Sequence, residues 1–223
     1  MLTEWVGPAC PPHSRARLPS SFLYPGEVAV WRVRLDDPRL EALPAASAGE
    51  ESHAERLHSG AARERYLLAH RALRAILGRA TGVPLDFAAT EKGKPYLPGA
   101  PQLMFSLSRS HGMALIALAL EVDVGVDVER LRPIAEYGAI AERFFPPSEA
   151  AAFADTPPAG RERDFFRRWT RVEAMLKARG VGLYGAGAEL EGEWTVREIE
   201  ACEGYAGAVA ASAAGMRVVV EDL

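Results

Sequence analysis

The sequence lacks the features of secreted, zinc-binding and membrane-spanning proteins. Its only cysteines, Cys10 and Cys202, form neither a CxxC pair nor a metal-ligand spacing, so we expect unpaired thiols in a reducing compartment. Its longest unbroken apolar run, Met113 to Leu120, is far too short to span a bilayer. Its first residues include Glu4 and no apolar core of a signal peptide. We therefore predict a cytoplasmic protein that does not enter a membrane.

Strong net charge and clustered histidines are also lacking. A formal charge of −4 over 223 residues gives no general attraction for nucleic acid. The five histidines are too scattered for a zinc site, and we expect His70 and His111 to be structural. One segment is unbalanced, since residues 161–171 hold five arginines against two acids. That segment is either a solvated helix face or a surface for a phosphate or an acidic partner.

Apolar periodicity predicts alternating helices and strands. We expect strands near residues 27–35, 85–90, 103–108, 113–120, 122–130, 193–200, 205–212 and 216–222. Helices are expected near 50–81, with a break at Ser59-Gly60, and near 134–144, 146–153 and 161–179. Short similar segments follow the two long helices (RATGVPL and KARGVGL). They indicate either two related α+β halves meeting near residue 120, with a cleft between them, or chance similarity.

Residues 122–130, VDVGVDVER, alternate valines with acids and one glycine. A period of two predicts a strand with one apolar and one acidic face. Asp127 and Glu129 lie on the same face, about 6.6 Å apart at the backbone, and can hold a hard cation such as Mg²⁺ between them. Gly125 leaves room for a ligand or for another backbone. The alternative is an exposed sheet edge kept soluble by its acids.

The last long helix places Trp169, Glu173 and Lys177 along one face, at positions i, i+4 and i+8. Several large apolar side chains nearby predict that this helix is largely buried. A buried glutamate needs a partner or a metal, whereas an exposed Glu–Lys pair would be an ordinary surface ion pair.

Two basic stretches are candidates for phosphate binding. Lys92 and Lys94 lie in the glycine loop EKGKP, and Ser108 and Arg109 lie in FSLSRSHG at a strand end. Lysine and arginine suit phosphate oxygens, although lysines in such loops are commonly just solvated. Arg63, on the first long helix, is similarly ambiguous.

The ordered motifs GKPYL, FSLSRS, GVDVE, FFPPSE and WTRVEAMLKARGVGL resemble the 4′-phosphopantetheinyl transferases of the Sfp type. The resemblance covers about residues 60–185 and, more loosely, the whole chain. It implies an α+β monomer of two similar halves related by a pseudo-twofold axis, each a small, mostly antiparallel sheet packed with a long helix. Residues 1–120 would contact the adenosine and phosphates of coenzyme A, and residues 121–223 would carry the magnesium ligands and the catalytic helix.

The resemblance further implies a Mg²⁺-dependent enzyme of secondary-metabolite biosynthesis. It would transfer phosphopantetheine from coenzyme A to a serine of an acyl or peptidyl carrier protein, releasing adenosine 3′,5′-bisphosphate. The implied metal ligands are Asp127, Glu129 and Glu173, and the implied catalytic residues are Glu173, Lys177 and Asp127. The implied coenzyme contacts are Arg63, Lys92, Lys94, Ser108, Arg109 and Lys177. The alternatives are a non-catalytic module that binds coenzyme A or a carrier, and a nucleotide phosphohydrolase.

The chain departs from the family pattern at three positions. Arg109 replaces the usual histidine of the SHS motif, Val172 stands where lysine is common, and Ser106 replaces an asparagine. An arginine keeps a phosphate contact but not a titrating role. The expected consequence is altered substrate affinity rather than a different reaction. Phe144 and Phe145 are expected to be either core residues or part of a carrier-docking patch.

Overall fold

The computed structural model describes residues 23–182 and 192–223. The helices are α1 (Ala48–Glu55), α2 (Gly60–Thr81), α3 (Tyr137–Phe144), α4 (Pro147–Ala154) and α5 (Arg161–Arg179), with short 3₁₀ turns at Pro38–Ala42 and Pro158–Gly160. The strands are β1 (Glu27–Arg34), β2 (Ala88–Ala89), β3 (Pro95–Tyr96), β4 (Leu103–Ser110), β5 (Met113–Leu120), β6 (Val124–Arg130), β7 (Thr195–Ile199), β8 (Tyr205–Ala211) and β9 (Arg217–Asp222). The predicted α+β class is confirmed.

Local signals explain where the long helices begin and end. The hydroxyl of Ser59 accepts the N–H of Ala62 and so caps the start of α2, at the predicted break. Gly82 and Gly180 follow α2 and α5 in the left-handed conformation, with φ of 66° and 63°. The acidic strand is shorter than predicted, because β6 begins at Val124 rather than at Val122.

Two larger sheets have the same strand order within the two halves of the chain. In β1–α2–β4–β5 and in β6–α5–β7–β8, the last strand lies between the other two, giving the orders β4-β5-β1 and β6-β8-β7 with antiparallel pairing throughout. This agrees with two similar α+β halves, while the twofold axis itself stays a prediction. β9 comes last in the chain but pairs in parallel with β1, so it extends the first sheet.

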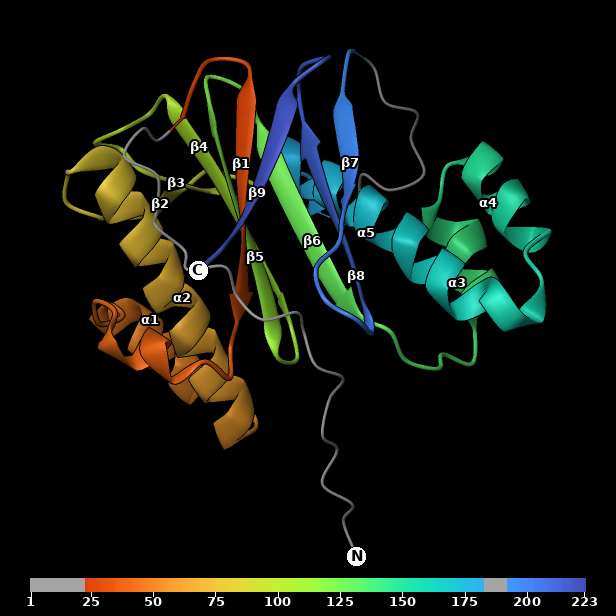
Figure 1. The fold of residues 1–223 in the computed structure, drawn as a ribbon, viewed down its shortest axis with the longest axis horizontal. Coiled ribbons are helices and arrows are strands. Elements are labelled where there is room, and N and C mark those ends of the chain that lie inside the picture. The colour runs from red at the N-terminus through yellow and green to blue at the C-terminus, as the bar shows by residue number, and fades with distance from the viewer. Residues whose placement is uncertain (1–22, 183–191) are drawn as a thin grey trace, which may run out of the picture.

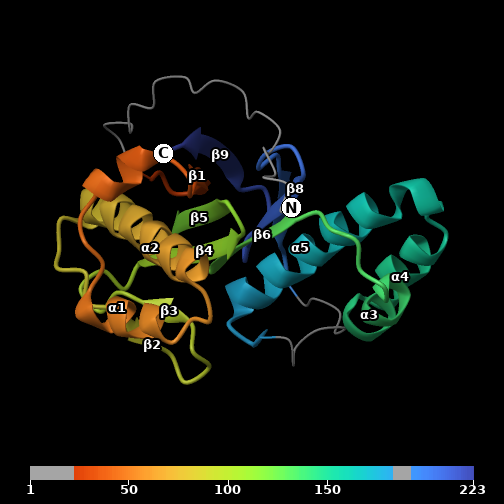
Figure 2. The same cartoon turned by 90° about the horizontal axis from the view of Figure 1, so that it is seen from below.

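The sheets pack face to face between the two long helices (Figure 1). Alternate residues of β1 and β5 point to opposite sides: Trp31 and Ile116 contact α2, whereas Val30 and Leu115 contact the second sheet. β5 is therefore buried on both faces, which explains its continuous apolar run. On the far side, alanines of α5 lie against alanines of β8, and Figure 2 shows the two long helices on either side of the sheets.

Gly125 is required because the backbone of α5 lies directly on β6. A Cβ atom at this position would lie 2.0 Å from the carbonyl oxygen of Ala174 and 2.3 Å from the amide nitrogen of Ala178. The glycine thus makes room for another backbone, one of the two predicted reasons. The alternative of an exposed acidic edge is wrong, since Asp127 is only 4% exposed.

The two sheets are joined at β4 and β6 by side chains. Three serine hydroxyls of β4 accept backbone N–H groups of β6, namely Ser106 from Val126 at 3.1 Å, Ser108 from Val128 at 3.3 Å and Ser110 from Arg130 at 3.1 Å. This serine ladder, Ser106–Ser108–Ser110, satisfies buried backbone donors that would otherwise be unpaired. It fixes the register of β6, and with it the acidic residues, against the first half.

The cysteine prediction is wrong for Cys202, which is disulfide-bonded. No described cysteine is a free thiol, and Cys10 lies outside the described residues. Cysteine content therefore gives no support for a reducing compartment, and the cytoplasmic location stays a prediction. Within residues 23–182 and 192–223, no helix combines the length and apolarity needed to cross a membrane.

Candidate functional site

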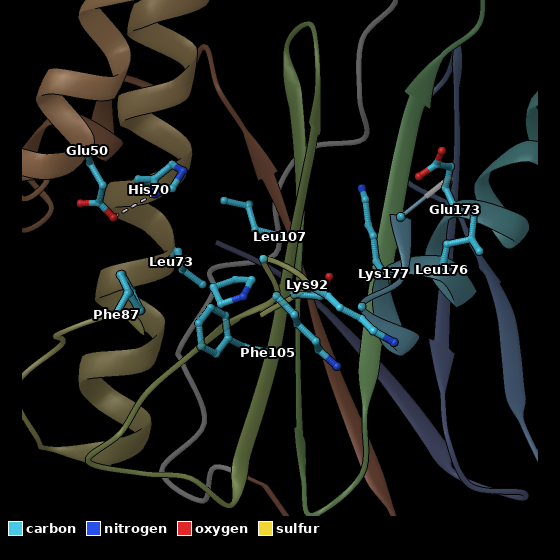
Figure 3. Close-up of a pocket in the computed structure, with 16 residues that line it drawn as sticks. Glu50, His70, Leu73, Phe87, Lys92, Phe105, Leu107, Glu173, Leu176 and Lys177 are labelled. Carbon is cyan, nitrogen blue, oxygen red and sulfur yellow. Dashed lines mark hydrogen bonds and ion pairs between the residues drawn. The ribbon is translucent and has the colours of Figure 1, made fainter. Parts of the chain in front are cut away.

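A cavity of about 510 Å³ opens between the two halves, bounded by α2, β4, the loop around Gly93 and the C-terminal part of α5. Its apolar lining includes Leu73, Phe87, Phe105, Leu107 and Leu176, and its charged or titratable lining includes Glu50, His70, Lys92, Lys94, Glu173 and Lys177. Glu50 and His70 lie on one side, and Glu173 and Lys177 lie on the other (Figure 3). The cavity thus places groups of both charges in a largely apolar cleft.

Lys177 joins α5 to a buried acid of β6. Its ammonium donates to Oδ1 of Asp127 at 2.7 Å and to the hydroxyl of Ser108 at 2.8 Å. Ser108 itself donates to the same carboxylate oxygen at 2.8 Å. The other oxygen of Asp127, Oδ2, is buried and has no hydrogen-bond partner in the part of the chain that the structure describes. Asp127 is therefore a buried anion with one oxygen still free to bind a donor or a cation.

Glu173 has a raised pKa. Burial is the main cause, and the negative charge of Asp127 raises the pKa further, while the nearby Lys177 lowers it and Glu129 adds a smaller increase. The three acids are thus within electrostatic reach of one another. A carboxyl group with a raised pKa holds a proton more readily than an ordinary glutamate, which suits a group that accepts a proton during a reaction.

The three predicted metal ligands do not form a ready-made metal centre. Across residues 23–182 and 192–223, no group of three or more His, Cys, Asp or Glu is arranged to hold an ion. Lys177 already occupies one oxygen of Asp127. Ser110 and Arg132 both donate to Oε2 of Glu129, at 2.8 and 3.3 Å. The donor chemistry still fits a hard cation, because carboxylates predominate and the Oδ2 atom of Asp127 is unpartnered.

The candidate phosphate contacts differ in their surroundings. Lys92 is exposed and lines the cavity. Lys94 also lines it, but its ammonium donates to Asp123 and to the carbonyl of Ala178, both at 2.5 Å, so it ties the glycine loop to the end of α5. Lys177 contributes a third ammonium from the opposite wall.

Arg63 and Arg109 lie outside the cavity lining. Arg63 donates to the carbonyls of Ala54 and Glu55 at 3.3 Å, which places it at the end of α1. The guanidinium of Arg109 lies over the ring of Tyr66, 5.1 Å from its centre. The structure therefore places Lys92, Lys94 and Lys177 along one cavity, and Ser108 contacts the ammonium of Lys177. Arg63 and Arg109 are not among the lining residues.

Glu50 is a cavity residue that the sequence reasoning missed. It is 8% exposed and accepts hydrogen bonds from His70 Nδ1 at 2.9 Å, from Arg74 Nε at 2.6 Å and from the backbone N–H of Ser47 at 2.7 Å. Burial would raise its pKa, but the hydrogen bonds from His70 and Arg74 outweigh burial and lower the pKa to about 2. The Ser47-x-x-Glu50 spacing, a capping box, was the available signal.

The arginine-rich segment is mostly used for internal ion pairs. Its paired members are Arg167 with Asp164 and Glu198, Arg168 with Asp164 and Glu149, and Arg171 with Glu149. These pairs hold α5 to α4 and β7. The docking role considered for Phe145 is also not available, because Phe145 is 2% exposed within an aromatic core cluster.

Comparisons with known proteins agree with the sequence motifs. A profile described as the 4′-phosphopantetheinyl transferase superfamily matches residues 123–209, the segment that holds Asp127, Glu129, Glu173 and Lys177. The 4′-phosphopantetheinyl transferase HetI of Nostoc sp. is 36% identical over 174 residues, covering 74% of this chain and 73% of the relative. A putative 4′-phosphopantetheinyl transferase of Synechocystis sp. is 31% identical, covering 70% and 66%. The 4′-phosphopantetheinyl transferase of Bacillus subtilis is 28% identical, covering 63% of each.

Proposed function

The chain belongs to the 4′-phosphopantetheinyl transferase superfamily, and from that premise we propose that it transfers the phosphopantetheine group of coenzyme A to a serine of an acyl or peptidyl carrier protein. The products would be the modified carrier and adenosine 3′,5′-bisphosphate. The observation that best supports this is the placement of Lys92, Lys177 and the half-buried Glu173 in one cavity between the halves. We expect a cytoplasmic monomer that serves secondary-metabolite biosynthesis.

The proposed reaction is an in-line displacement at phosphorus. The carrier serine oxygen forms a bond to the phosphorus that bears pantetheine, and the bond from that phosphorus to the bisphosphate oxygen breaks. Such transfers depend on positioning and charge stabilisation more than on covalent catalysis. Glu173 takes the serine proton, directly or through water, because its pKa is raised by burial and by Asp127. Lys177 stabilises charge on the phosphate oxygens and is itself held by Ser108 and Asp127.

We further propose that Mg²⁺ is held by Asp127, Glu129 and Glu173, with the unpartnered Oδ2 of Asp127 as one donor. A bound Mg²⁺ would neutralise negative charge on the diphosphate and stabilise the leaving group. Three carboxylates exceed the charge of one such ion, so the substrate's phosphates need cations of their own. Lys92 and Lys177 are the proposed contacts in the cavity. Lys94 would act mainly by holding the glycine loop against α5.

Intact-mass analysis of carrier proteins tests the proposal. We expect each accepted carrier to gain one phosphopantetheine when incubated with the enzyme, coenzyme A and Mg²⁺, and to gain none when a chelator is present. Asp127→Asn and Glu173→Gln should abolish the gain while the variants remain folded. Binding of coenzyme A with no gain on any of several carriers would favour a non-catalytic module. Release of phosphate without a carrier would favour a phosphohydrolase.

A further inference from the structure

His70 is held in a defined orientation at the cavity wall. Its ring stacks on Tyr66, the preceding turn of α2, with 4.1 Å between ring centres. Its Nδ1 lies 2.9 Å from Oε1 of Glu50, and the His70 side chain is 19% exposed. The same ring therefore packs against the protein on one side and borders the cavity on the other. It is more than the structural histidine that the sequence suggested.

The hydrogen-bond partner of Nδ1 determines whether the other ring nitrogen, Nε2, can donate or accept a hydrogen bond. Glu50 is an anion that accepts hydrogen bonds from Arg74 and Ser47 as well as from His70, and a carboxylate can only accept. When the imidazole is neutral, its hydrogen therefore lies on Nδ1, toward Glu50, and Nε2 is an acceptor. Nε2 makes no hydrogen bond with the described residues. Nε2 of His70 is thus an acceptor of fixed orientation that can bind a donor group of a ligand.

The surroundings of His70 favour a flat ring. Leu73, Phe87, Phe105 and Leu107 line the cavity beside it, and Phe87 and Phe105 lie 5.5 Å apart between ring centres. Apolar and aromatic walls stabilise a planar base by burial and stacking. Figure 3 shows these residues on the His70 side, apart from Lys177 and Glu173. The phosphopantetheine end must remain within reach of a carrier serine, so the adenosine end is the part of coenzyme A that suits an enclosed apolar pocket.

We propose that Nε2 of His70 accepts a hydrogen bond from the exocyclic amine of the coenzyme's adenine, and that the Glu50–His70 pair selects adenine over hypoxanthine. This rests on the proposed function, in which coenzyme A is the donor. Hypoxanthine carries a carbonyl oxygen in place of the amine, so two acceptors would face each other. A site that pairs with a donor rejects an analogue lacking it, because the buried acceptor is left unpaired. His70 is thus a specificity-determining residue.

The test compares binding of coenzyme A and of its analogue with hypoxanthine in place of adenine. Dissociation constants are measured by calorimetry on the full chain with Mg²⁺ at about pH 8. Wild type should bind coenzyme A at least about tenfold more tightly than the analogue. His70→Phe keeps a ring against Tyr66 but has no acceptor, so it should bind both within about twofold. His53→Phe is the matched control, because His53 also stacks on Tyr66, at 4.9 Å, but does not line the cavity.

His70→Gln keeps the test decisive if the phenylalanine variant does not fold. A glutamine amide can present either an oxygen or an NH₂ group, so this variant should bind both ligands with similar affinity. If wild type binds the two ligands equally, or if either His70 variant discriminates between them as wild type does, the proposed role of His70 is wrong. The proposed function is not affected by either result. Failure of wild type to bind coenzyme A would overturn the proposed function as well.

Discussion

The ammonium of Lys177 lies 2.7 Å from Oδ1 of Asp127, which joins the catalytic-helix candidate α5 to the acidic strand β6. The two partners differ in burial: the Asp127 side chain is 5% exposed and that of Lys177 is 32% exposed. The Asp127 carboxylate is held in the interior, whereas Lys177 borders the cavity. A phosphate in the cavity can therefore share the ammonium without displacement of Asp127.

Replacing Lys177 by methionine should affect both stability and activity. The change leaves the buried Asp127 carboxylate without its cation, which we expect to lower the free energy of unfolding by about 2 kcal/mol. It also removes positive charge from the phosphates, so transfer should fall at least about 100-fold. Urea unfolding and carrier mass gain measure the two effects. Arg179→Met, an exposed site on the same helix, is the control, and wild-type transfer by Lys177→Met would exclude Lys177 from the site.

Gly125→Ala should be strongly destabilising. The added Cβ meets the backbone of α5 at 2.0 Å, and neither the strand nor the helix can move without breaking the contact between them. We expect a loss of about 3 kcal/mol or more in the free energy of unfolding, or no folded protein. Gly138→Ala, in α3, is the matched control, because its Cβ would meet nothing within 4 Å. It should be neutral or stabilising by up to about 1 kcal/mol, and equal effects at the two sites would contradict the packing described.

Glu173→Gln should change the pH dependence of stability. The pKa of Glu173 is raised by burial and by the charge of Asp127, so the folded state binds this proton more tightly than the unfolded state. Stability from this group therefore falls as pH rises above the ordinary glutamate pKa. The glutamine variant escapes that loss and should exceed wild type in stability near pH 8, with the difference shrinking toward pH 4. Urea midpoints across this range check the trend, and a constant difference would contradict it.

Glu50→Gln should show the opposite dependence. The pKa of Glu50 is lowered from 4.5 to about 2, since hydrogen bonds from His70 and Arg74 outweigh burial. Its contribution is present above the unfolded pKa and is lost as pH falls through about 2. The variant should be less stable than wild type by about 2–3 kcal/mol near pH 7, with a smaller difference near pH 3. Glu51→Gln, at the adjacent exposed position of α1, should change stability little at either pH.

Lys92 and Lys94 should differ although they are two residues apart. Lys92 is exposed and makes no ion pair with a described residue, so Lys92→Met should weaken coenzyme A binding several-fold and leave stability nearly unchanged. Lys94→Met removes the hydrogen bonds to Asp123 and Ala178 and should lower stability by about 1–2 kcal/mol. Calorimetric titration and urea unfolding separate the two. A Lys94→Met protein of wild-type stability would show that the tether is dispensable.

The sequence by itself determined where the main helices and strands lie and which side chains share a face of each. The valine alternation predicted the acidic strand, the spacing of Trp169, Glu173 and Lys177 predicted a shared helix face, and the position of Gly180 predicted where α5 ends. These are local properties, because strand alternation, helical periodicity and capping each depend on residues a few positions apart. The family motifs are local in the same sense, because each is a short run of neighbouring residues.

Only the tertiary structure decided how those faces meet. The bond between Lys177 and Asp127 spans 50 positions and that between Ser108 and Asp127 spans 19. β9 joins the first sheet from the far end of the chain. The sequence left open whether Gly125 admits a ligand or a backbone, and the packing of α5 on β6 decided it. Such contacts depend on which buried surfaces pack together, and that choice follows from the total apolar area and hydrogen bonding of the whole chain rather than from any single segment.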